Sequence, residues 1–219
     1  MSTYAVPATF ADLLTLAEPL DAAPVIREEP HLRALIEAAR TGDREAFGDL
    51  VTLYQRVVFR TALAALGTRE DAEDATQDAF VMAWRKLAGF RGDSTFRTWL
   101  LTIVWRKALD RRRARRLWWA RTQWGATEES GPLDDLASTG PDPERRALSH
   151  DLSDRLRDEI RQLTPKLRDT LLLAATGEHS YDEISVMLGI PLGTVKWRVA
   201  EGRKILGKRL GAWGVRLGA

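Results

Sequence analysis

Apolar residues recur along most of this chain at the spacing of an α-helix, three or four residues apart. In the N-terminal part this spacing predicts helices at residues 31–40 and 44–66, separated by the tripeptide Thr41-Gly42-Asp43. Asp43 has the short carboxylate side chain that caps a helix N-terminus, and Gly67 is suited to ending the helix that Asp43 begins. Both helices need only a core to pack against, and no candidate chemistry lies on them.

Two further helices are predicted at residues 69–87 and 94–116. The first carries a narrow stripe of alanines, which lets neighbouring helices approach closely. The second follows a segment with two glycines, and Asp93 or Ser94 is positioned to cap it.

Helical spacing resumes at Leu148 and continues to Ile160. Leu163-Thr164-Pro165 marks the start of another helix, which ends before Gly177. Ser180 and Glu183 then form a capping box that begins a short helix, and a glycine turn leads into a longer helix at Thr194–Leu210. A short helix, a turn and a basic helix are typical of a helix-turn-helix, whose second helix enters the DNA major groove. An ordinary helical hairpin inside a bundle is the alternative.

The pattern predicts an all-α protein with two small helical domains joined by a flexible acidic linker, the second domain containing the helix-turn-helix. Residues 125–144 contain six acidic residues and no basic one, together with Gly and Pro, which is the composition of a linker. We expect an N-terminal extension at residues 1–30, a first domain at 31–116, the linker at 117–147, a second domain at 148–210 and a tail at 211–219. The extension is either a partner-binding arm or a frayed terminus, since its prolines confine any helix to about Thr9–Glu18.

Composition narrows the class of protein. The 219 residues are 44% hydrophobic, enough for globular cores, and 33 basic against 31 acidic residues leave a net charge of only +2. The absence of cysteine excludes disulfides and thiolate chemistry. No apolar run approaches the roughly 20 residues of a membrane span, and the N-terminus lacks a signal pattern. We therefore expect a cytoplasmic protein with no membrane insertion.

The small net charge conceals opposing blocks, of which the basic one is the strongest. Residues 106–116 contain seven Arg and Lys residues against one Asp, on a helix that also carries Trp99 and Trp105 outside its main apolar face. Such charge suits a phosphate backbone, and flat rings suit unstacked bases. Alternatively, the tryptophans belong to the core and the arginines form a solvated face.

The acidic block lies on the preceding helix. Glu70, Asp74 and Asp78 are spaced four residues apart and share one face, with Asp71 and Glu73 nearby. Three interpretations are open: a metal or acid–base site, a solvated face that complements the helix dipole, or a docking surface for a basic partner. The three histidines of the chain are isolated in sequence, so we favour the docking surface.

The loop between the acidic and basic helices carries Phe90 and Arg91 and opens onto the aromatic, basic helix. It is either a pocket for an extruded base or a simple turn.

Three segments together closely resemble one family, the bacterial extracytoplasmic-function (ECF) sigma factors of RNA polymerase, within the sigma-70 family. They are EDAEDATQDAFVMAW, FRGDSTFRTWL and LTPKLRDTLLLAATGEHSYDEISVMLGIPLGTVKWR. The resemblance covers about residues 40–116 and 148–210.

This resemblance implies two sets of binding residues. The first set would bind the β′ clamp helices of core RNA polymerase: Asp71, Glu73, Asp74, Gln77, Asp78 and Phe80. The second set would bind promoter DNA, at the −10 element through Phe90, Arg91, Phe96, Trp99, Arg106, Lys107, Arg111 and Arg113, and at the −35 element through Thr194, Lys196, Trp197, Arg198 and Arg203. No catalytic residue, cofactor or metal is implied, and the linker would run toward the RNA path.

The sequence departs from the family pattern at three places. Trp105-Arg106-Lys107 stands where an Arg-Asn-apolar run is more usual, which puts the −10 base preference in question. Trp197 replaces a usual Ser, and Glu201-Gly202 replaces a usual Arg-Ala. A bulky ring and an anion beside the groove should weaken or redirect −35 binding, because an added anion reduces counterion release.

Two other classes of function remain open from sequence. The chain could be a helix-turn-helix regulator that acts without polymerase, or a sigma-like interaction module held by an anti-sigma factor. An enzyme is not expected, because no nucleophile–base pair, phosphate-binding glycine loop or metal-ligand spacing is present.

Overall fold

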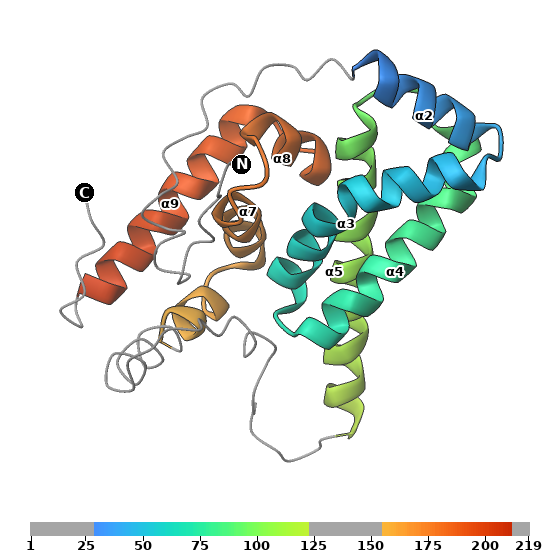
Figure 1. Cartoon of the computed structure of the whole chain (residues 1–219). Helices are drawn as coiled ribbons and strands as arrows, with labels where there is room; N and C mark the ends of the chain where they lie inside the picture. The colour runs from blue at the N-terminus through green and yellow to red at the C-terminus, as the bar shows by residue number, and fades with distance from the viewer. Residues whose placement is uncertain (1–28, 123–154, 212–219) are drawn as a thin grey trace, which may run out of the picture. The chain divides into compact units, whose positions relative to one another are not determined.

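A computed structural model describes residues 29–122 and 155–211, and every regular element within these ranges is a helix (Figure 1). The all-α class predicted from the sequence is confirmed. The helices belong to two compact units, which are described separately below. Most of the expected N-terminal extension and of the linker lies outside the described residues, as do residues 148–154 of the expected second domain and nearly all of the C-terminal tail. Pro30, which was expected in the extension, begins the first helix.

The first domain is built from four helices and one short 3₁₀ turn. They are α2 (Pro30–Arg40), α3 (Arg44–Leu66), α4 (Arg69–Lys86), η1 (Leu87–Gly89) and α5 (Phe96–Thr122). Helices α3, α4 and α5 pack against one another in all three pairings, and α2 packs on α3 (Figure 1). The alanine stripe of α4 is completely buried at Ala72, Ala75, Ala79 and Ala83, which lets α4 approach both neighbours closely.

The start and end of α3 follow the sequence prediction. Oδ1 of Asp43 accepts hydrogen bonds from the backbone N–H groups of Glu45 and Ala46, at 2.9 and 3.1 Å. These bonds satisfy two of the N–H groups that a helix leaves without an internal partner. Gly67 ends the helix with φ of 82°, a left-handed conformation that glycine adopts without a steric penalty.

Replacing this cap gives a first testable result. Asp43→Ala should destabilise the first domain by about 1 kcal/mol, because both N–H groups lose their acceptor. The midpoint of its thermal unfolding should fall by about 4–8 °C, measured by calorimetry on the full chain. The matched control is Asp49→Ala, also exposed on α3 but beyond its first turn. An equal shift in both variants would contradict the capping role.

The N-terminal end of α5 differs from the sequence prediction. Thr95, rather than Asp93 or Ser94, caps the helix, because its Oγ1 accepts a hydrogen bond from the N–H of Thr98 at 3.1 Å. Gly92 has φ of 75°, and the chain completes a turn there before the helix begins. At its other end α5 continues past Arg116 to Thr122.

The core of the first domain takes in an aromatic residue that the sequence placed on another face. Trp105 is 1% exposed, so its indole belongs to the core. The reason is that α5 is covered by both α3 and α4, so its buried surface is wider than a single stripe. Leu100, Leu101 and Val104 are buried on the same helix together with Trp105.

The second domain contains a helical segment at residues 155–161, followed by α7 (Pro165–Ala175), α8 (Tyr181–Leu188) and α9 (Leu192–Gly211). Helices α7 and α9 pack tightly at Gly202, where an added Cβ would lie 3.3 Å from Cδ2 of Leu171. An alanine, which is usual at position 202 in the family that the sequence resembles, would therefore have little room here.

The helix-turn-helix predicted from the sequence is present as α8, a turn and α9. The predicted capping box begins α8: the N–H of Ser180 donates to Oε2 of Glu183 at 3.0 Å, and the N–H of Glu183 donates to Oγ of Ser180 at 3.1 Å. Gly189 makes the turn with φ of 64°, and Oγ of Ser185 donates to the carbonyl of Ile190 at 2.6 Å. These bonds fix how the chain leaves α8 and enters α9.

Candidate functional site

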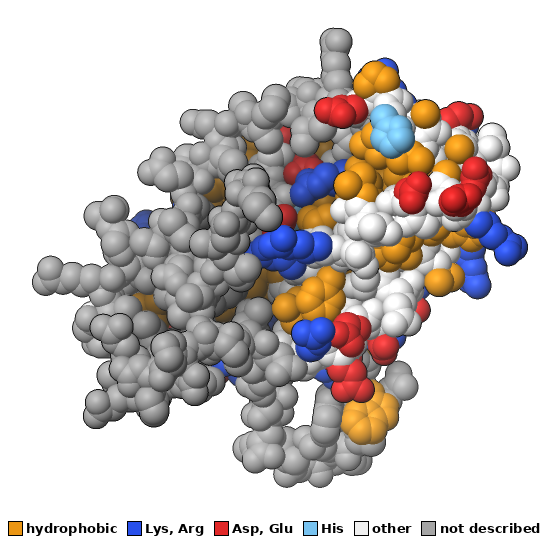
Figure 2. All heavy atoms as spheres, in the orientation of Figure 1, with side chains coloured by type: hydrophobic (Ala, Val, Ile, Leu, Met, Phe, Trp, Pro, Cys, Tyr) orange, Lys and Arg blue, Asp and Glu red, His pale blue; other side chains and the backbone are white. Residues whose placement is uncertain are grey.

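The acidic face of α4 is the first candidate binding surface. The side chains of Asp74, Asp78 and Glu73 are 57%, 51% and 49% exposed, and Gln77 is also exposed. Figure 2 shows acidic side chains gathered beside Lys and Arg at the lower end of the first domain. Within the described residues, no group of three or more His, Asp or Glu side chains is arranged to hold a metal ion.

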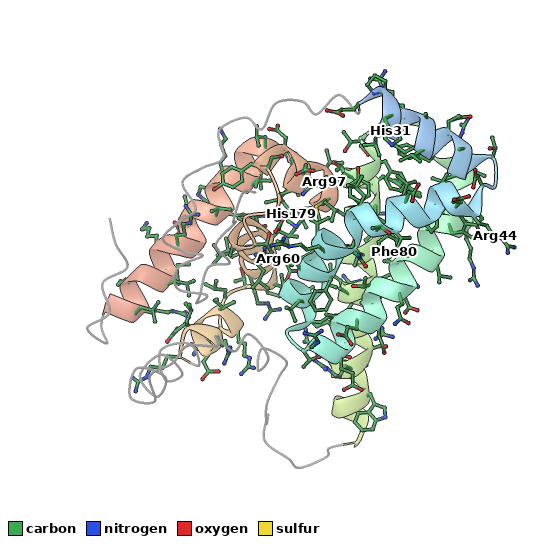
Figure 3. All side chains as sticks on the ribbon, viewed as in Figure 1. His31, Arg44, Arg60, Phe80, Arg97 and His179 are labelled. Carbon is green, nitrogen blue, oxygen red and sulfur yellow. The ribbon has the colours of Figure 1, made fainter. Side chains whose placement is uncertain are left out.

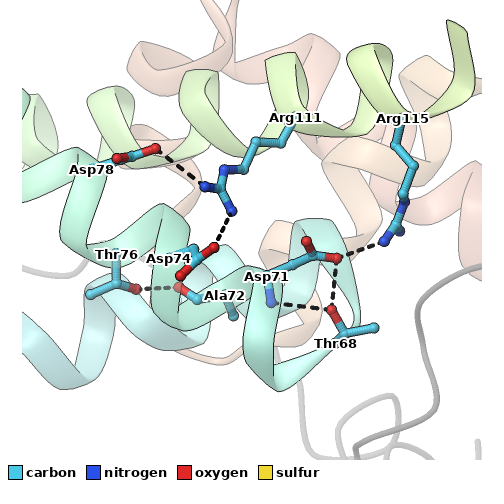
Figure 4. A network of polar contacts seen from close by, with 8 residues as sticks. All are labelled: Thr68, Asp71, Ala72, Asp74, Thr76, Asp78, Arg111 and Arg115. Carbon is cyan, nitrogen blue, oxygen red and sulfur yellow. Dashed lines mark hydrogen bonds and ion pairs between the residues drawn. The ribbon is translucent and has the colours of Figure 1, made fainter. Parts of the chain in front are cut away.

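The acidic face is joined to the basic helix α5 by ion pairs (Figure 4). Arg111 bridges two carboxylates one helical turn apart, with Nη1 3.1 Å from Oδ2 of Asp74 and Nη2 3.5 Å from Oδ2 of Asp78. One turn further along α5, Nη1 of Arg115 lies 2.6 Å from Oδ2 of Asp71, which also accepts a hydrogen bond from Thr68. The two surfaces predicted for different partners therefore neutralise part of each other's charge.

This pairing changes the prediction for Arg111. The sequence assigned it to DNA, but its guanidinium is directed at the carboxylates of α4. Of the other α5 cations predicted to bind DNA, Arg106 and Arg113 are exposed and Lys107 is half-buried. Nη1 of Arg113 lies 3.7 Å from Oδ1 of Asp110 on the same helix. Arg115 was not among the predicted site residues. It lies four residues after Arg111 and therefore on the same face of α5, but the sequence does not show that this face packs against α4.

Two predicted binding residues lie in the core. Phe96, assigned to DNA, is 0% exposed, and Phe80, assigned to polymerase, is 9% exposed (labelled in Figure 3). A buried side chain cannot contact a partner directly in this structure. Both phenylalanines contribute apolar surface to the helix packing beneath the binding faces.

The loop before α5 is held by an aromatic cluster. The ring of Phe90 lies 5.1 Å from that of the half-buried Trp99 and 5.9 Å from that of Phe96, and Tyr54 of α3 contacts Phe96 at 5.6 Å. Ring pairs at these distances contribute stabilising free energy in addition to that of their buried area. The cluster fixes the loop to the start of α5 and leaves Arg91 exposed.

Helix α9 presents the third candidate surface. Val195, Val199, Leu206 and Leu210 are buried on one side. The predicted DNA-binding residues lie on the other sides, with Lys196 and Trp197 exposed and Thr194, Arg198 and Arg203 half-buried. Glu201 is on the outward side as well, with Oε2 3.7 Å from Nζ of Lys204.

A basic aromatic helix and a separate helix-turn-helix, on described residues whose regular elements are all helices, are typical of a nucleic-acid-binding protein. The family model "Sigma-70 region 2" matches residues 50–117, and "Sigma-70, region 4" matches residues 153–206. The first covers α4 and α5, and the second covers the helix-turn-helix.

Several relatives match most of this chain and nearly all of their own length. The chain is 31% identical to the ECF RNA polymerase sigma factor SigW of Bacillus subtilis, over 83% of this chain and 98% of that protein. It is 30% identical to the ECF RNA polymerase sigma-E factor of Escherichia coli, over 81% and 93%. The chain therefore belongs to the sigma-70 family, as an ECF sigma factor that directs transcription initiation.

Solved structures show the same fold. The structure of CnrH in complex with the cytosolic domain of CnrY matches with a TM-score of 0.56 and 28% identity, over 82% of this chain and 97% of that chain. The sigma factor RpoE in complex with the anti-sigma factor NepR, from Bartonella quintana, matches with a TM-score of 0.53 and 23% identity, over 75% and 96%. No helix among the described residues is long and apolar enough to span a bilayer.

Proposed function

We propose that this sigma factor binds core RNA polymerase through the exposed acidic face of α4, namely Glu73, Asp74, Gln77 and Asp78. The −10 element would be melted and held by the loop at residues 90–95 and by α5, and the −35 element would be read as duplex by α9. The corresponding functional domains are residues 31–116 and 148–210.

The observation that supports this division most strongly is the separation of charge between helices. The outer face of α4 is acidic and would be repelled by DNA phosphates, so it suits a basic protein surface. The outer side of α9 carries Lys196, Lys204 and Lys208, which suit the phosphates on either side of a major groove.

The chain would perform no catalysis itself. It would supply promoter choice and strand opening to the polymerase, in the cytoplasm. CnrH was solved with the cytosolic domain of CnrY, and the sigma factor RpoE was solved with the anti-sigma factor NepR. We also propose an anti-sigma factor as a partner of this chain. A purified anti-sigma domain that matches this chain should reduce promoter-specific transcription in the assay below.

The direct experiment is transcription in vitro with the full chain, purified core polymerase and a pool of genomic promoter fragments. We expect discrete transcripts that begin downstream of one shared pair of DNA elements and that are absent without the chain. DNA binding by the chain with no dependence on polymerase would instead indicate a conventional helix-turn-helix regulator.

A single substitution on α9 tests the −35 assignment. Glu201→Arg should tighten binding of the holoenzyme to a duplex carrying the −35 element several-fold at low salt, since an anion beside the phosphates becomes a cation. The slope of log affinity against log salt should steepen by roughly one. Equal affinity of both proteins at low salt would contradict the placement of Glu201 next to DNA.

A further inference from the structure

Trp197 is the largest exposed apolar side chain on the helix that we assign to the −35 element. Its side chain is 61% exposed, a large fraction for an indole, which is usually mostly buried. It stands on the side of α9 opposite the buried residues Val195, Val199 and Leu206. More than half of its surface is therefore accessible to a partner.

The neighbours of Trp197 on α9 leave the indole uncovered. A helical side chain leans toward the N-terminus, over the residues three and four positions earlier. Four positions before Trp197 is Gly193, which has no side chain and no other atom within 4 Å of its missing Cβ. Three positions before it is Thr194, a half-buried residue with a short side chain. The ring therefore projects outward, toward the end of α9 that leads into the groove.

Cations flank the indole on both sides. Lys196 and Arg198 are about 100° away around the helix in opposite directions. No ion pair involves either of them within the described parts of the chain. When such a helix lies in a major groove, flanking cations reach the phosphates and the residue between them faces the base edges.

The apolar character of the indole indicates which group of the major groove it would contact. Its large apolar face has one partner on the floor of the major groove, the C5-methyl group of thymine, because the other exposed groups there are polar donors and acceptors. We propose that Trp197 reads thymine at one position of the −35 element by apolar contact with its C5-methyl group. This inference rests on the proposed function of α9.

The experiment removes the methyl group and nothing else. Duplexes are first selected from a random pool by core polymerase with the full chain, and each thymine of the −35 element is then replaced singly by deoxyuridine. One replacement should weaken binding by wild-type holoenzyme about fourfold, which corresponds to one buried methyl group. For holoenzyme carrying Trp197→Ser, the same replacement should have no effect.

Further variants keep the test specific. Trp197→Phe should retain part of the penalty, because a ring still faces the methyl group. The control Leu53→Ser removes another exposed apolar side chain, 59% exposed on α3, and should keep the full penalty.

The proposal is overturned if replacing thymine by deoxyuridine weakens binding at no position. It is also overturned if that replacement weakens binding by the Trp197→Ser holoenzyme as much as binding by the wild type. If no duplex is selected at all, the −35 assignment fails together with the inference. Normal transcripts without methyl sensitivity overturn the inference alone.

Discussion

Reversing two charges on α4, with Asp74→Lys and Asp78→Lys together, should reduce the affinity of the chain for core RNA polymerase about a hundredfold. Placing like charges against each other in a protein interface costs several kcal/mol, and a hundredfold corresponds to about 2.7 kcal/mol. The measurement is a binding titration of the full chain against purified core polymerase without DNA. The central claim is that the exposed carboxylates of α4 hold the polymerase.

The control variant changes the net charge equally at other exposed positions. Asp49→Lys with Asp110→Lys places the same two reversals on α3 and on α5, where Asp110 pairs with Arg113 and not with a residue of α4. This variant should bind core polymerase within about twofold of wild type. If both double variants lost affinity equally, the effect would come from overall charge, and the acidic face would have no special role.

Phe96→Ala should strongly destabilise the first domain. The ring is 0% exposed and contacts Tyr54, Phe90 and Trp99, so its removal deletes buried surface and leaves a cavity. The expected cost is about 3–5 kcal/mol of unfolding free energy. Calorimetry on the full chain should show the first domain unfolding at least about 12 °C lower.

Arg91→Ala is the matched comparison for Phe96→Ala, because Arg91 belongs to the same loop and is exposed. It should leave thermal unfolding unchanged and weaken opening of the −10 element in the transcription assay. If Phe96→Ala instead kept the wild-type unfolding temperature and lost promoter opening, Phe96 would contact DNA directly, in contradiction to its burial.

The local features of the fold were predictable because they depend on residues close together in sequence. Asp43 begins α3 and Gly67 ends it, as the sequence indicated. Ser180 and Glu183 form the capping box that begins α8, as their spacing indicated. Each of these signals is a hydrogen bond or a backbone conformation within one helical turn. The helix-turn-helix followed from the same local information.

The burial of aromatic residues on α5 was less predictable, because it depends on how many helices cover α5. A single amphipathic stripe would have left Trp105 outside the core, whereas contacts from both α3 and α4 enclose it. The helical spacing of Phe96 with Leu100 and Val104 predicts that Phe96 is buried, and this is confirmed. Its assignment to DNA came from family resemblance, which does not distinguish a side chain at the binding surface from one that supports it.

The ion pairs between α4 and α5 were not predicted either. Charge runs on two helices do not reveal that Arg111 lies opposite Asp74 and Asp78 until the helices are packed together. Asp74 and Asp78 are 57% and 51% exposed in these pairs, and Arg111 is 34% exposed. Ion pairs in contact with solvent contribute only about 0.2–1 kcal/mol each. They therefore leave the carboxylates available to a partner that offers stronger charge complementarity.

The most direct test of the acidic face separates the ion pairs that it forms within the first domain from the contacts that it would form with the polymerase. The triple variant Asp74→Lys, Asp78→Lys and Arg111→Asp exchanges the signs of all three groups, so the pairs within the first domain can form again. We predict that this variant unfolds at the wild-type temperature and still binds core polymerase about a hundredfold more weakly. Binding at wild-type affinity would show that these carboxylates serve only the internal pairs, and would contradict the proposed polymerase-binding face.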